Sequence, residues 1–255
     1  MGRGSNSRAF EKPMTLEQVF PGLRNAPGGA IIAVADDFFD FFGPGNAVQM
    51  ELASLASRRI REEIKQLDPN WRYDHLGPNN TVEGKYNELN DLRFKLAALT
   101  LQKKGDPRQL QVEAIRFLQS RVDAAYIQGI ALQKAGKLNM RLSPQEALGT
   151  YIDQRVRKEL RDRYNEFGID SAGRGPVRVN RREYDTSGTD STYFQPDSRV
   201  DKLALDVTLT RKTLGSGQVR GFFNSDFRPD LVVIIRPSQL GRGHTYIIAR
   251  PESKR

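Results

Sequence analysis

The pattern of hydrophobic and polar positions changes once along the chain, after Gly168, and a domain boundary is expected near residue 140. Before that point, apolar residues recur every three or four positions with charged residues between them, which predicts α-helices. The first helix is expected over 46–67, ended by Asp68-Pro69, and the second follows through Tyr86–Leu99. A third helix is expected to begin at Asp106-Pro107, because Asp can cap a helix and proline fits its first turn.

The C-terminal part opens with one more helix and then changes to an alternating pattern. Ser143-Pro-Gln-Glu146 has the form of a capping box and predicts a helix that continues to about Gly168. Beyond it, alternating and then β-branched segments predict strands at 177–184, 193–200, 203–210, 231–235 and 245–249, with a short helix at 218–223. We therefore expect an α+β protein, with a helical N-terminal region followed by an α/β core that has a mixed central sheet.

These patterns predict three segments. Residues 1–45 form a leader or linker punctuated by glycine and proline, residues 46–140 a helical domain, and residues 141–255 the α/β domain. The polar N-terminus lacks the apolar stretch of a signal peptide, and no apolar run is long enough for a membrane span. We therefore expect a protein without a membrane partner and without a cleavable signal peptide.

Composition narrows the possible chemistry. The chain has no cysteine, which excludes disulfides, zinc-thiolate sites and cysteine nucleophiles, and its two histidines exclude a multi-histidine metal site. The net charge is +9, and residues 151–255 contain 20 Lys and Arg against 14 Asp and Glu. Such an excess favours polyanionic partners, nucleic acid above all, and leaves carboxylates, lysine and arginine to carry any reaction.

Two aspartates stand out in the predicted strands. Asp206 lies in mid-strand among apolar neighbours, where an unpaired carboxylate is costly, and Asp197 lies on the preceding strand. A tight hairpin would place the two side by side, where they repel each other unless a cation lies between them. Mg²⁺ or Mn²⁺ prefers such oxygen ligands, so the sequence predicts a divalent metal site at Asp197 and Asp206.

The segment around these residues resembles a known family. Pro196-Asp197, the strand with Asp206, a lysine, a short helix and a hydrophobic strand resemble the PD-(D/E)xK restriction-endonuclease-like superfamily. The same segment resembles the toxin domains at the C-termini of bacterial polymorphic toxins of the Rhs and type VI secretion effector type. The motif lysine is expected two residues after the second acid, but Thr208 occupies that position. Lys212, Lys202 or Arg220 would have to replace it.

The resemblance implies a set of site residues. Asp197 and Asp206 would match the two motif acids, with Lys212 as the catalytic lysine and Glu159 as an acid supplied by the preceding helix. Gln218 and Arg220 lie where the family's second helix carries polar residues that face the substrate. Basic residues near the strands would hold the phosphate backbone, namely Arg199 and Arg211.

The predicted function is that of a Mg²⁺-dependent endonuclease, a phosphodiester hydrolase that cleaves DNA as an antibacterial effector toxin. The resemblance also implies an immunity protein that masks the site, a secretion carrier, and action in the cytoplasm of a target cell. Two alternatives stay open: a ribonuclease toxin, including a metal-independent enzyme built on His244, and a nucleic-acid-binding module with an inactive nuclease core.

Overall fold

In the computed structural model of the protein, the residues described are 46–73, 80–138, 143–184, 192–241 and 243–251. The predicted leader at 1–45 lies outside them. The chain forms two compact units that divide between Glu113 and Ala114. It is a mixed α+β protein with a helical N-terminal part, as expected, and a central sheet that contains both parallel and antiparallel neighbours.

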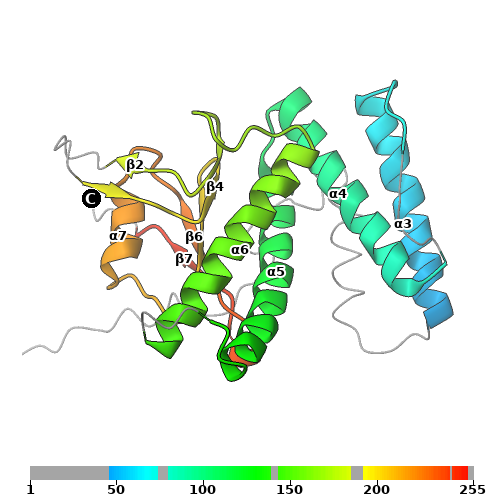
Figure 1. The fold of residues 1–255 in the computed structure, drawn as a ribbon. Coiled ribbons are helices and arrows are strands. Elements are labelled where there is room, and N and C mark those ends of the chain that lie inside the picture. The colour runs from blue at the N-terminus through cyan, green and yellow to red at the C-terminus, as the bar shows by residue number, and fades with distance from the viewer. Residues whose placement is uncertain (1–45, 74–79, 139–142, 185–191, 242, 252–255) are drawn as a thin grey trace, which may run out of the picture. The chain divides into compact units, whose positions relative to one another are not determined.

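The N-terminal unit is helical. Helices α3 (Asn46–Leu67) and α4 (Val82–Lys104) pack side by side (Figure 1) through an apolar cluster that includes Ile60, Ile64 and Leu89. Helix α5 (Arg108–Lys134) starts in this unit and continues into the C-terminal unit from Ala114; it begins two residues after Asp106, whose carboxylate accepts a hydrogen bond from the Arg108 amide at 3.0 Å. Within the described residues, none of the helices has the length and apolar character needed to cross a membrane.

The C-terminal unit carries a five-stranded sheet. Its strands are β1 (Val177–Val179), β4 (Ser198–Val200), β5 (Leu203–Val207), β6 (Leu231–Ile235) and β7 (Tyr246–Ala249), in that spatial order. Only β5 and β6 are parallel neighbours, because helix α7 (Gly217–Asn224) forms the crossover between them. Helix α6 (Pro144–Glu166) begins with the predicted capping box at Ser143 and Glu146.

Two expected strands each divide into two shorter ones, and the strand expected at 203–210 ends at Val207. The segment 177–184 divides into β1 and β2 (Glu183–Tyr184), because Asn180 has φ 53° and turns the chain. The segment 193–200 divides into β3 (Tyr193–Phe194) and β4, separated by Gln195 and Pro196, and proline has no amide to donate to a ladder. Strands β2 and β3 pair with each other in a separate two-stranded ribbon.

Helix α7 covers one face of the sheet and is anchored by aromatic side chains. Phe222, Phe223 and Phe227 pack with Val232 and Ile234 of β6 in a buried cluster. Phe194 of β3 packs against the same cluster and lies directly over Gly221 of α7. This packing fixes α7 on the sheet, and the start of α7 lies close to the carboxyl end of β5.

We expect the variant Gly221→Ala to lower the free energy of unfolding by about 1–3 kcal/mol, because the added Cβ would overlap the Phe194 ring. Urea unfolding followed by circular dichroism measures this loss. Gly217→Ala in the same helix is the matched control, since open space surrounds its Cβ position and its stability should be equal or slightly higher. Equal stability of the two variants would contradict this packing.

Candidate active site

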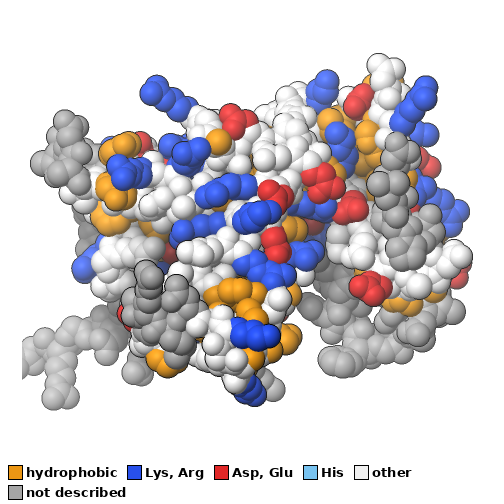
Figure 2. Space-filling view, in the orientation of Figure 1, with side chains coloured by type: hydrophobic (Ala, Val, Ile, Leu, Met, Phe, Trp, Pro, Cys, Tyr) orange, Lys and Arg blue, Asp and Glu red, His pale blue; other side chains and the backbone are white. Residues whose placement is uncertain are grey.

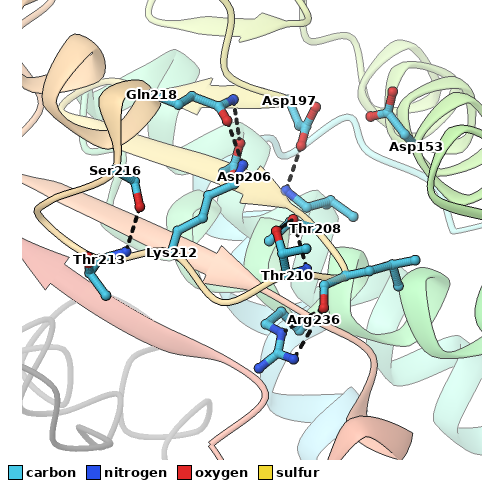
Figure 3. A network of polar contacts seen from close by, with 12 residues as sticks. Asp153, Asp197, Asp206, Thr208, Thr210, Lys212, Thr213, Ser216, Gln218 and Arg236 are labelled. Carbon is cyan, nitrogen blue, oxygen red and sulfur yellow. Dashed lines mark hydrogen bonds and ion pairs between the residues drawn. The ribbon is translucent and has the colours of Figure 1, made fainter. Parts of the chain in front are cut away.

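A cleft of about 710 Å³ opens in the C-terminal unit where α6, the end of β5 and the start of α7 meet. Polar and charged side chains line much of it. They come from α6 (Glu146, Asp153 and Arg157), from the position just before β4 (Asp197), from β5 (Asp206), from the loop after β5 (Thr208, Thr210 and Lys212) and from α7 (Gln218). Figure 3 shows Asp153, Asp197, Asp206, Lys212 and Gln218 approaching one another from separate elements of the chain.

Asp197 and Asp206 lie opposite each other at the end of the β4–β5 hairpin. The register pairs Ser198 with Leu205, and continuing it by one residue places Asp197 across from Asp206. Their side chains are only 6% and 2% exposed. A two-residue turn at Asp201 and Lys202 joins the strands, so this short connection sets the register that brings the two carboxylates together.

Lys212 reaches back to Asp206 from the loop after β5. Its Nζ lies 2.6 Å from Oδ2 of Asp206 and 2.6 Å from Oε1 of Gln218, whose Nε2 donates to Oδ1 of Asp206 at 3.0 Å (Figure 3). The Tyr246 hydroxyl fixes the lysine backbone, accepting from its amide at 2.7 Å and donating to its carbonyl at 2.8 Å. The loop therefore places a lysine beside the second acid although Thr208 occupies the motif position.

Helix α6 supplies two site residues that the sequence reasoning missed, Asp153 and Arg157. Nε and Nη2 of Arg157 donate to Oδ1 of Asp197 at 2.8 and 2.6 Å, and the Val207 amide donates to Oδ2 of the same carboxylate at 2.5 Å. Oδ1 of Asp153 lies 2.6 Å from Nε of Arg157, yet this buried oxygen accepts no hydrogen bond, because the N–H group is directed at Asp197.

Crowding of carboxylates perturbs their protonation. Burial and then the charge of Asp197 raise the pKa of Asp153 to about 7, although Arg157 opposes the shift. Burial and the charge of Asp197 likewise raise the pKa of Asp206 to about 6, against the opposing effect of Lys212. The raised pKa values show that the negative charges of this acidic cluster, Asp153, Asp197 and Asp206, are unfavourable where they lie, and a proton or an added cation would relieve them.

We expect the protein without divalent metal to lose stability between about pH 5 and pH 8. The raised pKa values mean that the folded state binds more protons than the unfolded state in this range, so stability falls as pH rises. Glu183, whose pKa burial raises to about 7, adds to the same trend. Thermal melts in EDTA should show a lower melting temperature near pH 8, and Asp153→Asn should reduce the difference. A melting temperature that stays level or rises would contradict these shifts.

The structure does not bring Glu159 to the site. Its carboxylate pairs with Arg155 at 2.8 Å and lies 3.7 Å from Arg121, and it does not line the cleft. Glu159 follows Asp153 by six residues, which rotates it by about two thirds of a turn to another face of α6. Of these two acidic residues of α6, Asp153 is therefore the one that lines the cleft together with Asp197 and Asp206.

The three predicted substrate-binding arginines lie away from the cleft lining. Arg199 donates to Glu183 at 2.8 Å and packs over the Phe227 ring, while Arg211 lies over the ring of Tyr246. Arg220 is exposed on α7. Of the predicted substrate-binding residues, Gln218 is the one that the structure brings into contact with the acidic pair.

The chemistry of the donor set fits a hard divalent cation. Carboxylate oxygens of Asp153, Asp197 and Asp206 are the ligands that Mg²⁺ and Mn²⁺ prefer, and the buried Asp153 Oδ1 lacks a hydrogen bond. Across the described part of the chain, however, no group of three acidic or histidine side chains is arranged to hold a metal. In the structure the protein's own groups contact these carboxylates: Arg157 lies at Asp153 and Asp197, and Lys212 and Gln218 bond the two oxygens of Asp206.

Positive charge on the visible face of α6 is mixed with negative charge. Lys and Arg side chains spread over this helix with Asp and Glu among them (Figure 2), as in the pairs Arg155–Glu159 and Lys158–Asp162. This face therefore does not present a uniform basic surface.

Comparison of the chain with protein-family models, curated proteins and solved structures finds no match.

Proposed function

We propose that the protein is a metal-dependent nuclease that hydrolyses phosphodiester bonds, with DNA as its substrate. The observation that carries the proposal is the placement of Asp197 opposite Asp206 with Nζ of Lys212 2.6 Å from Asp206, in a cleft. One acid on β5, a second acid just before the neighbouring strand β4 and a lysine beside Asp206 correspond to the parts that the resemblance to the PD-(D/E)xK superfamily implies. Here the lysine comes from a loop instead of the strand.

The order of the elements supports the same proposal. Helix α6 precedes the antiparallel strands β1, β4 and β5, and helix α7 then leads to the parallel strand β6. Both acids lie near the point where β5 ends and the chain turns toward α7. The finer assignment, a restriction-endonuclease-like core, follows from this order together with the resemblance and belongs to the proposal.

Each residue has a role that its position permits. Asp197 and Asp206 would hold Mg²⁺ or Mn²⁺ with support from Asp153, and the bound cation would polarise a phosphoryl oxygen and lower the pKa of an attached water. Lys212 presents a positive charge at the second acid, where it can stabilise the negative charge that develops on the phosphate oxygens. Gln218 orients Lys212 by accepting a hydrogen bond from its Nζ at 2.6 Å.

The proposed biological role is that of an antibacterial effector toxin. It rests on the resemblance to polymorphic toxin domains, which also implies a secretion carrier and an immunity protein. A cleft lined by four carboxylates, those of Glu146, Asp153, Asp197 and Asp206, would offer such an inhibitor a target for basic side chains. The net positive charge of the whole chain would favour its encounter with nucleic acid in the target cell.

Purified protein incubated with plasmid DNA or with RNA, in Mg²⁺ or in EDTA, tests the proposed activity. We expect cleavage of DNA in Mg²⁺ and none in EDTA. Cleavage of RNA in EDTA would contradict the metal-dependent proposal and favour a ribonuclease of another kind, such as one built on His244. Binding to either polymer without cleavage would favour an inactive nuclease core.

A further inference from the structure

Arg157 occupies the acidic cluster as a cation would. Two of its N–H groups converge on one oxygen of Asp197, at 2.8 and 2.6 Å, and its Nε also lies 2.6 Å from Oδ1 of Asp153. The guanidinium thus neutralises two carboxylates that otherwise repel each other. The other oxygen of Asp197 is held by the Val207 amide, so the oxygen that Arg157 covers is the one turned toward Asp153.

We propose that Arg157 is an internal counterion of the metal-free site, which occupies the cation-binding side of Asp197 and withdraws when a divalent cation binds. This inference rests on the proposed function, because it assigns the cation to the same carboxylates. The Arg157 guanidinium and a cation held by Asp197 and Asp206, with support from Asp153, would repel each other strongly if both contacted the same oxygen of Asp197. The two therefore compete, and Arg157 sets the affinity of the site for metal.

The side chain of Arg157 is placed to move. It is 25% exposed, and it lines the cleft, so its guanidinium can swing into solvent while the helix backbone stays in place. Lys212 is fixed at both ends of its side chain. Asp206 and Gln218 bind its ammonium group, and the Tyr246 hydroxyl binds its backbone. Arg157 can accordingly leave Asp197 when a cation binds, whereas Lys212 stays beside Asp206.

Competition and simple structural support predict opposite results for the same variant. If Arg157 competes with the cation, Arg157→Met should bind Mn²⁺ roughly tenfold more tightly than the unmodified protein, because a positive charge leaves the site. If Arg157 only holds the carboxylates in a binding-competent arrangement, its loss should weaken binding. Arg157→Lys, which keeps the charge but loses the forked contact, should lie between.

Isothermal titration of the full chain with Mn²⁺, without nucleic acid, separates these outcomes. Arg155→Met is the matched control, because Arg155 lies on the same helix but pairs with Glu159 and Tyr151, and its affinity should not change. Circular dichroism melts establish that each variant is folded. Unchanged or weaker Mn²⁺ binding by folded Arg157→Met would overturn the inference, as would the absence of Mn²⁺ binding in every variant.

The titration distinguishes this inference from the proposed nuclease activity. If Arg157→Met binds Mn²⁺ more tightly but the unmodified protein cleaves no nucleic acid, the counterion role stands and the proposed function fails. If the protein cleaves DNA in Mg²⁺ and the variant binds Mn²⁺ no more tightly, the proposed function stands and the counterion role fails.

Discussion

The variant Asp206→Asn is expected to cleave DNA about a thousandfold more slowly than the unmodified protein in Mg²⁺. Asparagine has the same shape but lacks the charge, so it removes a cation ligand and the partner of Lys212 together. It also removes a buried carboxylate whose pKa is raised to about 6, and the folded protein should therefore keep its stability at neutral pH. Initial rates of plasmid nicking measure the loss.

Asp201→Asn is the control for this variant. Asp201 lies in the turn of the same β4–β5 hairpin with φ 53°, a conformation that asparagine tolerates well. Its substitution makes the same chemical change away from the cleft lining, and the cleavage rate should stay within about twofold of the unmodified protein. Cleavage by Asp206→Asn at the control's rate would show that Asp206 is not part of the active site.

Lys212→Met is expected to lower the cleavage rate by about a hundredfold to a thousandfold. The variant keeps the length of the side chain but removes the ammonium that lies 2.6 Å from Asp206. Without the Lys212 ammonium group, the phosphate oxygens lose the positive charge that the protein supplies beside Asp206. The same nicking assay measures the effect, with circular dichroism to establish that the loop change leaves the fold intact.

The two other candidates for the motif lysine provide the comparison. Nζ of Lys202 donates to the Phe227 carbonyl at 2.7 Å, and Arg220 is exposed on α7. Neither lines the cleft, so Lys202→Met and Arg220→Met should retain most of the activity. Loss of activity in either of them, with Lys212→Met unaffected, would assign the lysine role elsewhere.

Features governed by local rules could be predicted from the sequence. The capping box at Ser143 opens α6 where the pattern places it, and the β-branched segment at 231–235 forms β6 with the same bounds. The short helix expected at 218–223 is α7, longer by one residue at each end. Capping, hydrophobic period and β-branching act over a few neighbouring residues, and the sequence displays all three directly.

Features that depend on tertiary placement could not be predicted in the same way. Asp153 and Glu159 both pair with an arginine four residues away or closer on α6, so spacing alone does not reveal which acid faces the strands. Lys212 reaches Asp206 because the Tyr246 hydroxyl, on a distant strand, fixes the intervening loop. The position of Arg157 at Asp197 likewise requires the packing of α6 beside the sheet, a contact between residues 40 positions apart.

Binding of a divalent cation by the acidic cluster at the end of the β4–β5 hairpin can be observed by anomalous diffraction from crystals of the protein soaked in Mn²⁺. We expect an anomalous peak in contact with the carboxylates of Asp197 and Asp206, with Arg157 turned away from Asp197. A peak elsewhere in the protein, or none at a Mn²⁺ concentration that supports cleavage, would show that these carboxylates do not form the metal site.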